Sequence, residues 1–186
     1  MKLQLILLGM AMVLSGFQTV TGVAASIPQD DAQQVKYQRI RMNEFQNFLV
    51  GWDTAAQPQR LALIRSAEEY DQLFQPAAVN GSRGPFSPDA KSYAKEQILL
   101  VGRQMPAPDK LEAVFEVESL EEQGQTLVLK YRYRAPAAAS YEVRNYVALR
   151  LPAKPYERVV FIENGKEAGE LKLSQGEWVK PAQERE

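Results

Sequence analysis

The chain has 186 residues, with 22 Lys and Arg against 23 Asp and Glu, and it contains neither cysteine nor histidine. The near balance of charge argues against a nucleic-acid binder, which would carry a clear basic excess. Without cysteine and histidine, disulfides are excluded, and zinc, copper and haem sites of the usual kinds are not expected. The commonest general base near neutral pH is missing as well. We therefore expect no cofactor and no bound metal.

The first 25 residues have the layout of a secretory signal peptide. Met1 and Lys2 supply positive charge, residues 3–14 are almost all apolar, and small residues close the segment at Ala24 and Ala25. This pattern predicts cleavage after Ala25, or alternatively after Ala24, and a periplasmic or secreted mature protein. An uncleaved anchor is the other interpretation, but a spanning helix needs roughly 20 largely apolar residues. We therefore expect no stable membrane insertion after cleavage.

The rest of the chain shows one uninterrupted stretch between two polar ends. Residues 26–34 and 181–186 are polar and each contain a proline. Between them no linker, repeat or low-complexity tract stands out, and about 160 residues are enough for one hydrophobic core. We expect a signal peptide over 1–25, a flexible leader over 26–34, a single α+β domain over 35–180 and a tail over 181–186.

The first half of the mature chain predicts short elements. Strands are expected over 35–42 and 61–66, whereas 45–52 is apolar but of no assigned type. A buried strand is expected over 97–105, and the turn-forming dipeptides within 80–88 predict a loop.

A capping box marks the start of one helix. Ser66 and Glu69 have the spacing at which the serine oxygen accepts from the Glu69 amide and the glutamate accepts from the serine amide. Pro76 is expected to stop the helix. The apolar positions that recur at helical spacing define its buried face: Tyr70, Leu73 and Phe74.

The second half is richer in strands. Alternating polarity predicts half-buried strands over 111–118, 127–134 and 144–151, with a turn at 121–125 between the first two. A further strand over 158–163 runs into Asn164-Gly165, the sequence of a type I′ hairpin turn, and returns over 169–173. The fold class is therefore α+β: a mainly antiparallel β-sheet, sandwich- or open-barrel-like, with one or two short helices.

A basic sheet face is the first candidate binding site. If strands 127–134 and 144–151 are neighbours, their cations point to one side, as an anion- or partner-binding surface. The alternative is a solvated face neutralised by the preceding strand, with Glu116 opposite Lys130 and Glu112 opposite Arg134. The residues of this predicted face are Lys130, Arg132, Arg134, Arg144, Tyr146 and Arg150.

Two further features have competing interpretations. Phe86, in the Gly/Pro-rich loop, would anchor a partner if exposed, or plug the core if buried. Asp30-Asp31 lacks the alternating ligands of a calcium loop and is interpreted as solvated leader.

One short motif raises the question of catalysis. Ser92 and Lys95 match the Ser-x-x-Lys spacing of certain acyl-transfer enzymes, but the companion motifs are absent. We interpret both as surface residues before the strand at 97–105. Paired carboxylates from distant positions stay open as an alternative, and no catalytic residue is assigned.

The order of segments resembles a known family of exported domains. Leu63-Ile64-Arg65-Ser66-Ala67-Glu68-Glu69-Tyr70 precedes Glu96-Gln97-Ile98-Leu99-Leu100-Val101-Gly102, and strands at 115–119, 127–130, 149–152 and 159–161 follow. This order is similar to the C-terminal domain of the protease-complex subunit PrcB and of many envelope proteins, over about Arg60 to Ile162. Pro106–Lys110 replaces the family's Thr-Gly-Gly-Tyr-like turn. The resemblance implies an accessory, protein-binding role without catalytic residues.

The sequence therefore predicts an exported, non-enzymatic accessory or protein-binding module of the cell envelope. Its partner is expected to be another envelope or secreted protein, and not nucleic acid. The alternatives are a histidine-independent hydrolase, using carboxylates or the Ser92–Lys95 pair, and an envelope protein that binds glycan or anionic polymer through the basic face.

Overall fold

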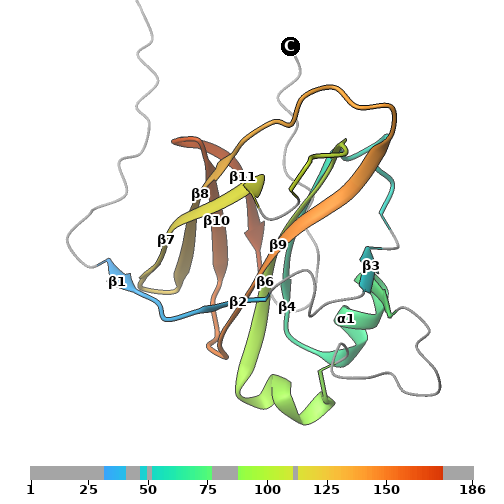
Figure 1. Cartoon of the computed structure of the whole chain (residues 1–186). Helices are drawn as coiled ribbons and strands as arrows, with labels where there is room; N and C mark the ends of the chain where they lie inside the picture. The colour runs from blue at the N-terminus through green and yellow to red at the C-terminus, as the bar shows by residue number, and fades with distance from the viewer. Residues whose placement is uncertain (1–31, 41–46, 50–51, 77–87, 111–112, 174–186) are drawn as a thin grey trace, which may run out of the picture.

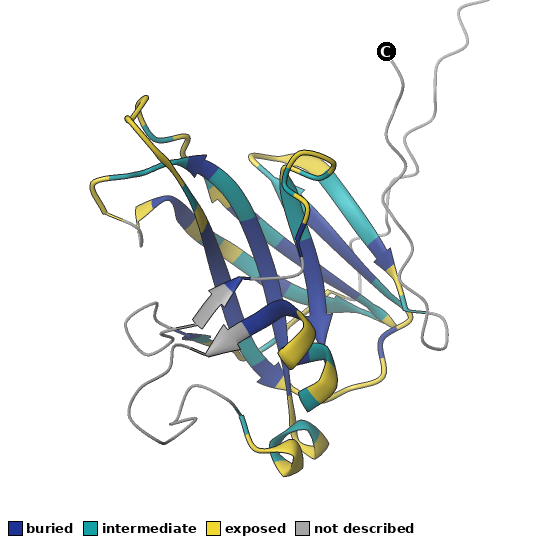
Figure 2. Cartoon of the chain, turned by 90° about the vertical axis from the view of Figure 1, so that its right-hand side faces the viewer, coloured by how far each residue is buried: buried dark blue, intermediate teal, exposed yellow. Residues whose placement is uncertain are grey.

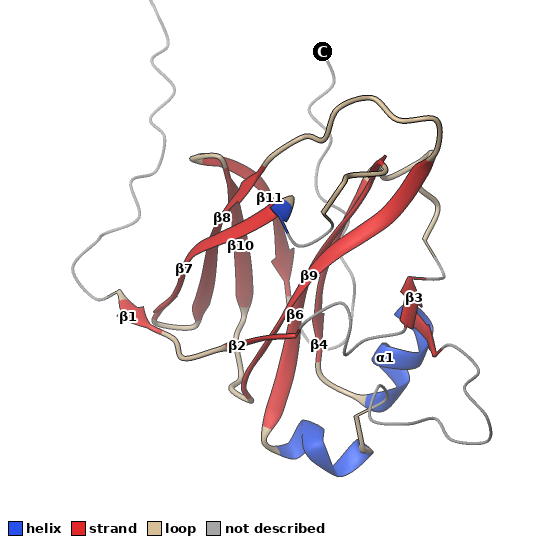
Figure 3. Ribbon diagram, viewed as in Figure 1, coloured by secondary structure: helices blue, strands red, loops and turns tan. Residues whose placement is uncertain are grey.

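Two larger β-sheets, a small two-stranded sheet, one short α-helix and a 3-10 helix make up the described part of the computed structural model (Figure 3). The model describes residues 32–40, 47–49, 52–76, 88–110 and 113–173. The sheets are open and face each other like the layers of a sandwich, mostly antiparallel, which confirms the predicted fold class.

Sheet A has five strands and carries the single parallel pairing among the described strands. The pairing of β8 with β10 is parallel, and the other pairings in this sheet are antiparallel. In spatial order the strands are β1 (Gln33–Gln34), β7 (Phe115–Gln123), β8 (Thr126–Tyr133), β10 (Arg158–Glu163) and β11 (Lys166–Lys172).

Sheet B has four antiparallel strands and carries a small third layer. In spatial order they are β2 (Gln38–Ile40), β9 (Glu142–Pro152), β6 (Glu96–Pro106) and β4 (Gln59–Ile64). The third layer contains the helix α1 (Ala67–Leu73) and a two-stranded sheet of β3 (Asn47–Leu49) and β5 (Phe74–Pro76); the 3-10 helix η2 (Ala90–Ala94) precedes β6. Figure 1 shows the order of layers: sheet A, sheet B, then α1 with β3.

The larger hydrophobic core lies between the two sheets. Alternate residues of each strand point into it, as the period of two in the sequence requires. Sheet A contributes Phe115, Leu127, Leu129, Tyr131 and Phe161, and sheet B contributes Leu61, Leu99, Val101, Val147 and Leu149, among others.

A second core covers the opposite face of sheet B. Tyr70 and Leu73 of α1, together with Phe74 and Trp52, pack on Ala62, Ile64, Ile98, Leu100 and Ala148 of the sheet. The middle of sheet B is therefore buried on both faces, and Figure 2 shows buried residues in dark blue. The strand predicted over 144–151 is present within β9, but its predicted half-burial is wrong, because Tyr146 and Ala148 are buried as well.

The N-terminal strands divide between the two sheets. Residues 35–42 were expected to form one strand, but Gln33–Gln34 pairs with β7 in sheet A and Gln38–Ile40 pairs with β9 in sheet B. Gln33 and Gln34 therefore belong to a sheet and not to a flexible leader. The segment thus crosses from one layer to the other, as Figure 1 shows.

The predicted helix start is confirmed in part. The Ser66 side chain accepts a hydrogen bond from the Glu69 amide at 3.1 Å. The Glu69 carboxylate accepts from the Arg65 amide at 2.6 Å instead of the Ser66 amide. The helix ends at Leu73, before Pro76, because Phe74 already has an extended backbone and begins β5. Tyr70, Leu73 and Phe74 are all buried, as predicted.

Both tight hairpins are two-residue turns that contain a residue with positive φ. Asn164 and Gly165 have φ of 52° and 79°, which confirms the type I′ turn. Gly124 has a φ of 59° and, with Gln125, joins β7 to β8. The strand β7 therefore runs on to Gln123, and the broader turn predicted over 121–125 is wrong.

Candidate partner-binding surface

The predicted basic face does not exist as one surface. Its six residues come from β8, from Arg134 directly after it, and from β9. The two strands lie in different sheets, because β8 pairs with β7 and β10 whereas β9 pairs with β2 and β6. Lys130, Arg132 and Arg134 follow the outer face of sheet A, and Arg144, Tyr146 and Arg150 belong to sheet B. The alternation predicted for 127–134 holds, whereas on β9 Tyr146 is buried, and the assumption that the two strands are neighbours is wrong.

The two cations of β8, and Arg134 directly after it, are paired with glutamates of β7. The ion pairs are Lys130–Glu121 at 2.9 Å, Arg132–Glu118 at 2.6 Å and Arg134–Glu116 at 2.7 Å. This confirms a neutralised face, although the register differs from the predicted one because the turn is tighter and β7 has a bulge between Val117 and Ser119. Glu112 lies outside the described residues.

The pairing also fixes the charge of one carboxylate. Hydrogen bonds from Lys130 and Ser119 hold the pKa of the Glu121 carboxyl below its usual value. A general acid needs the opposite shift. The outer face of sheet A is therefore a stabilised, ion-paired surface in which Glu121 is kept ionised.

The β9 residues of the predicted face are engaged with sheet B and its cover. The Arg144 guanidinium donates to the Leu49 carbonyl at 3.1 Å and lies 5.9 Å from the Trp52 ring. Tyr146 is only 4% exposed, and burial raises the pKa of its hydroxyl. Arg150 pairs with Glu96 at 3.4 Å. Tyr146 is thus a core residue and not an accessible contact.

The Ser-x-x-Lys match lies on a 3-10 turn. Ser92 is within η2 and half-buried, and Lys95 is its exposed C-terminal cap, whose amide donates to the Ser92 carbonyl at 2.9 Å. Tyr93 between them packs against the second core. Both residues precede β6 at the surface, as expected. Phe86 and Asp30-Asp31 lie outside the described residues.

A polar cluster connects the two sheets near one end of the sandwich. Arg103 of β6 donates to both carboxylate oxygens of Glu163 of β10, at 2.9 and 2.8 Å, and its guanidinium lies 4.1 Å from the Tyr133 ring. Tyr131 donates to the same carboxylate at 2.9 Å and accepts from Gln59 at 2.7 Å. Burial and the Glu163 charge together raise the pKa of Tyr131. We call these four residues, Gln59, Arg103, Tyr131 and Glu163, the inter-sheet clamp.

Exposed connections surround this end of the sandwich. Residues 134–141 run from β8 in sheet A to β9 in sheet B, beside residues 107–110 and the Asn164-Gly165 turn. The Ala107 amide donates to the Tyr141 carbonyl at 3.0 Å, and the Arg134 amide donates to the Val114 carbonyl at 2.9 Å. We call residues 107–110, 134–141 and 164–165 the loop end.

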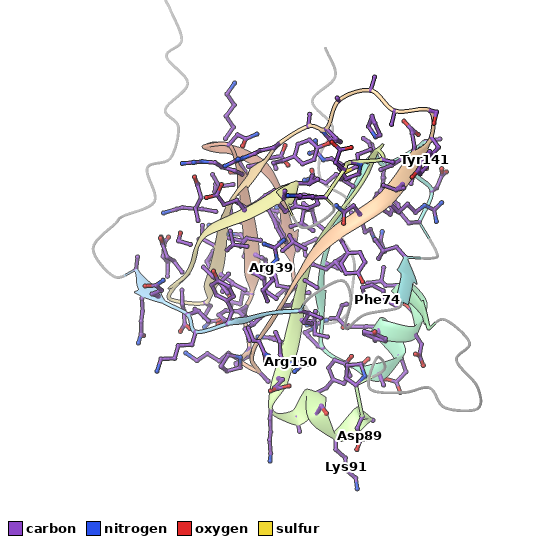
Figure 4. All side chains as sticks on the ribbon, viewed as in Figure 1. Arg39, Phe74, Asp89, Lys91, Tyr141 and Arg150 are labelled. Carbon is purple, nitrogen blue, oxygen red and sulfur yellow. The ribbon has the colours of Figure 1, made fainter. Side chains whose placement is uncertain are left out.

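Tyr141 is the prominent side chain of the loop end. It is 64% exposed, against 37% for Tyr37, the other large apolar residue with an exposed side chain in the described ranges. Figure 4 shows it at the start of β9, on the opposite end of that strand from Arg150. Sequence reasoning missed it. The alanines and Pro136 between two strands indicate a loop, but alternation alone does not show that the ring of Tyr141 stays outside the core.

Comparisons with known proteins give no further guide. No family model matches the chain, and no curated protein or solved structure matches it significantly. The resemblance to the PrcB C-terminal domain stays a prediction.

The described part of the chain has neither a membrane-spanning helix nor a metal-ligand cluster. It contains no helix with the length and apolar character needed to cross a membrane. Within the same ranges, no three acidic residues are gathered in a way that would hold a metal ion.

Proposed function

We propose that this chain is an exported, non-enzymatic accessory module that binds a protein of the cell envelope through its loop end. The observation that carries the proposal is Tyr141, a residue that is 64% exposed although its backbone is hydrogen-bonded to Ala107. An aromatic ring on a fixed backbone offers a large contact area at low conformational cost. Tyrosine is accordingly enriched at protein interfaces.

The chain that leads to Tyr141 suits the same role. Residues 135–139 consist of four alanines and one proline, and all but the half-buried Pro136 are exposed. Alanine and proline lose almost no side-chain entropy when a partner covers them. The loop end therefore combines one large anchor with a flanking surface that needs little ordering.

The state of the cations favours a protein partner over an anionic polymer. Lys130, Arg132 and Arg134 would have to leave their glutamates before they could bind sulfate, phosphate or uronate groups along sheet A. The export part of the proposal depends on the first 25 residues, and the accessory role is also what the resemblance to the PrcB domain implies.

Site-specific photo-crosslinking tests the proposal. A photoreactive phenylalanine analogue placed at position 141 of the full chain should give a discrete protein adduct in cells that make the protein. The same analogue at position 132 on sheet A and at position 37 should give none. Equal adducts at all three positions would contradict a specific surface, and an adduct to glycan would favour the polymer binder.

Affinity for the captured protein provides the quantitative step. Tyr141→Ala should weaken binding by about tenfold or more, because truncation of a central aromatic anchor has a large cost. Tyr37→Ala, the matched control, should leave binding unchanged. Catalytic turnover by the purified mature chain would contradict the non-enzymatic part of the proposal.

A further inference from the structure

The side chain of Asn164 pairs with the end of a strand that is not part of its own hairpin. Its Oδ1 accepts from the Tyr133 amide at 3.1 Å, and its Nδ2 donates to the Tyr133 carbonyl at 3.1 Å. Its own amide donates to the Tyr131 carbonyl at 2.9 Å. The Asn164 amide group thus takes the place that a neighbouring strand's backbone would have beside Tyr133, and lengthens the β8–β10 ladder beyond Glu163.

Two requirements meet at this position, and asparagine satisfies both. The backbone has a φ of 52°, which asparagine adopts more readily than most residues with a side chain. The side chain must offer one acceptor and one donor, which an amide does and a carboxylate does not. Glycine would satisfy the backbone alone, and aspartate would keep only the acceptor.

The residue held by this contact is the start of the connection that carries Tyr141. Tyr133 is the last residue of β8, with its ring 5.5 Å from Phe115 and beside the Arg103 guanidinium. The connection is fixed at its other end by the hydrogen bond between Ala107 and Tyr141. The connection is therefore hydrogen-bonded at both ends: Asn164 of the β10–β11 turn binds Tyr133, the residue before it, and Ala107, the residue after β6, binds Tyr141.

We propose that Asn164 is a positioning residue for the partner-binding surface. Its two side-chain hydrogen bonds to Tyr133 hold the beginning of the 134–141 connection, and the connection presents Tyr141 in one orientation. The Asn-Gly pair thus forms the β10–β11 turn and also fixes the crossing between the two sheets. The effect of Asn164 on partner binding rests on the proposed function. Its role in fixing the start of the 134–141 connection does not.

Hydrogen exchange of single backbone amides tests whether the Asn164 side chain holds Tyr133 in place. Asn164→Gly keeps the turn and removes both bonds, so exchange of the Tyr133 amide should become about tenfold faster, the effect of losing one net hydrogen bond of about 1.4 kcal/mol. Asn164→Asp retains the acceptor, so its exchange rate at the Tyr133 amide should lie between those of wild type and Asn164→Gly. Amides of the central strands, such as that of Leu99, should keep their wild-type rates.

The matched control lies in the other two-residue turn. Gln125→Ala changes an exposed turn residue at the opposite end of β8 and should leave the Tyr133 amide unchanged. Unchanged exchange at Tyr133 in Asn164→Gly would overturn the proposal. Equal acceleration at Tyr133 and Leu99 would overturn it too, because Asn164 would then support only overall stability.

The crosslinking experiment separates this inference from the proposed function. Asn164→Gly should lower the yield of the specific adduct at position 141, and Gln125→Ala should not. If wild-type protein gives no specific adduct while the exchange result holds, the proposed function fails and the hold on the connection stands. If the adduct forms but its yield is the same in Asn164→Gly, the positioning role is refuted and the binding surface stands.

Discussion

Sheet A and sheet B differ in what covers their outer faces. The outer face of sheet B is packed against α1, Phe74 and Trp52, so that Leu100 and Ala148 are fully buried. The outer face of sheet A is covered by charged side chains, with Lys130–Glu121 and Arg158–Glu170 on either side of the Val128–Val160 pair. Apolar burial therefore supports sheet B on both sides, whereas sheet A depends on one apolar side and on ion pairs of small individual value.

The largest contrast is expected from one truncation on the outer face of sheet B. Leu100→Ala should lower the free energy of unfolding by about 3 kcal/mol, because it removes a buried side chain and leaves a cavity. Denaturant unfolding measures it. Lys130→Ala, the corresponding change on the outer face of sheet A, should cost about 0.5 kcal/mol. Equal costs would show that the two faces do not differ as described.

The inter-sheet clamp should give the next largest effect. Glu163→Gln removes the counter-ion of Arg103 and should lower the free energy of unfolding by about 2 kcal/mol, since the pair is mostly buried and its hydrogen bonds are charge-assisted. Replacing both partners, by Glu163→Leu with Arg103→Met, should cost less than Glu163→Gln alone, because no charge is then left unpaired. An additive double variant would show that the two groups do not interact.

Alkaline pH should weaken the contact between Tyr156 and Glu122, at the end of the sandwich opposite the loop end. Burial and the Glu122 charge raise the pKa of Tyr156 to about 12 from its ordinary value of 10.0. The folded state therefore holds a proton that the unfolded state loses, and stability should fall between pH of about 10 and about 12. Tyr156→Phe should reduce the slope of that fall. An unchanged slope in equilibrium unfolding across this range would refute the assignment.

The smallest effect is expected on the exposed arginines of both sheets. Replacing Arg132, Arg134 and Arg150 together by alanine should lower the free energy of unfolding by about 1 kcal/mol at most, because the ion pairs are open to solvent. The loss should shrink further at high salt. A fall in melting temperature as large as that of Leu100→Ala would mean that these three arginines contribute substantially to the stability of the fold.

The same difference between the sheets explains which parts of the fold could be predicted. On β8, alternation placed Leu127, Leu129 and Tyr131 inside and Lys130 outside, because one face of sheet A meets solvent. On β9 the same rule failed at Tyr146, because a third layer covers that face. A period of two tells which face a residue occupies, but the cover on that face comes from residues far along the chain.

Strand neighbours could not be predicted in the same way. The Asn164-Gly165 turn was recognised because its φ angles depend on two adjacent residues. The parallel pairing of β8 with β10 depends instead on the path of β9 through the other sheet. The candidate site could not be predicted for the same reason. Tyr141 is exposed because the chain crosses between the two sheets at this point, and no local sequence pattern encodes that crossing.

The first two strands also set the order in which this fold can form. Gln33–Gln34 pairs with Glu121–Glu122, and Gln38–Ile40 pairs with Ala148–Arg150, so each contact joins distant parts of the chain. During synthesis, which begins at the N-terminus, β1 and β2 have no pairing partners until β7 and β9 have been made. Closing such long loops is entropically costly, and folds rich in distant pairings assemble slowly. The edges of β7 and β9 would then be the last to be protected, which makes them the positions most exposed to mispairing during assembly.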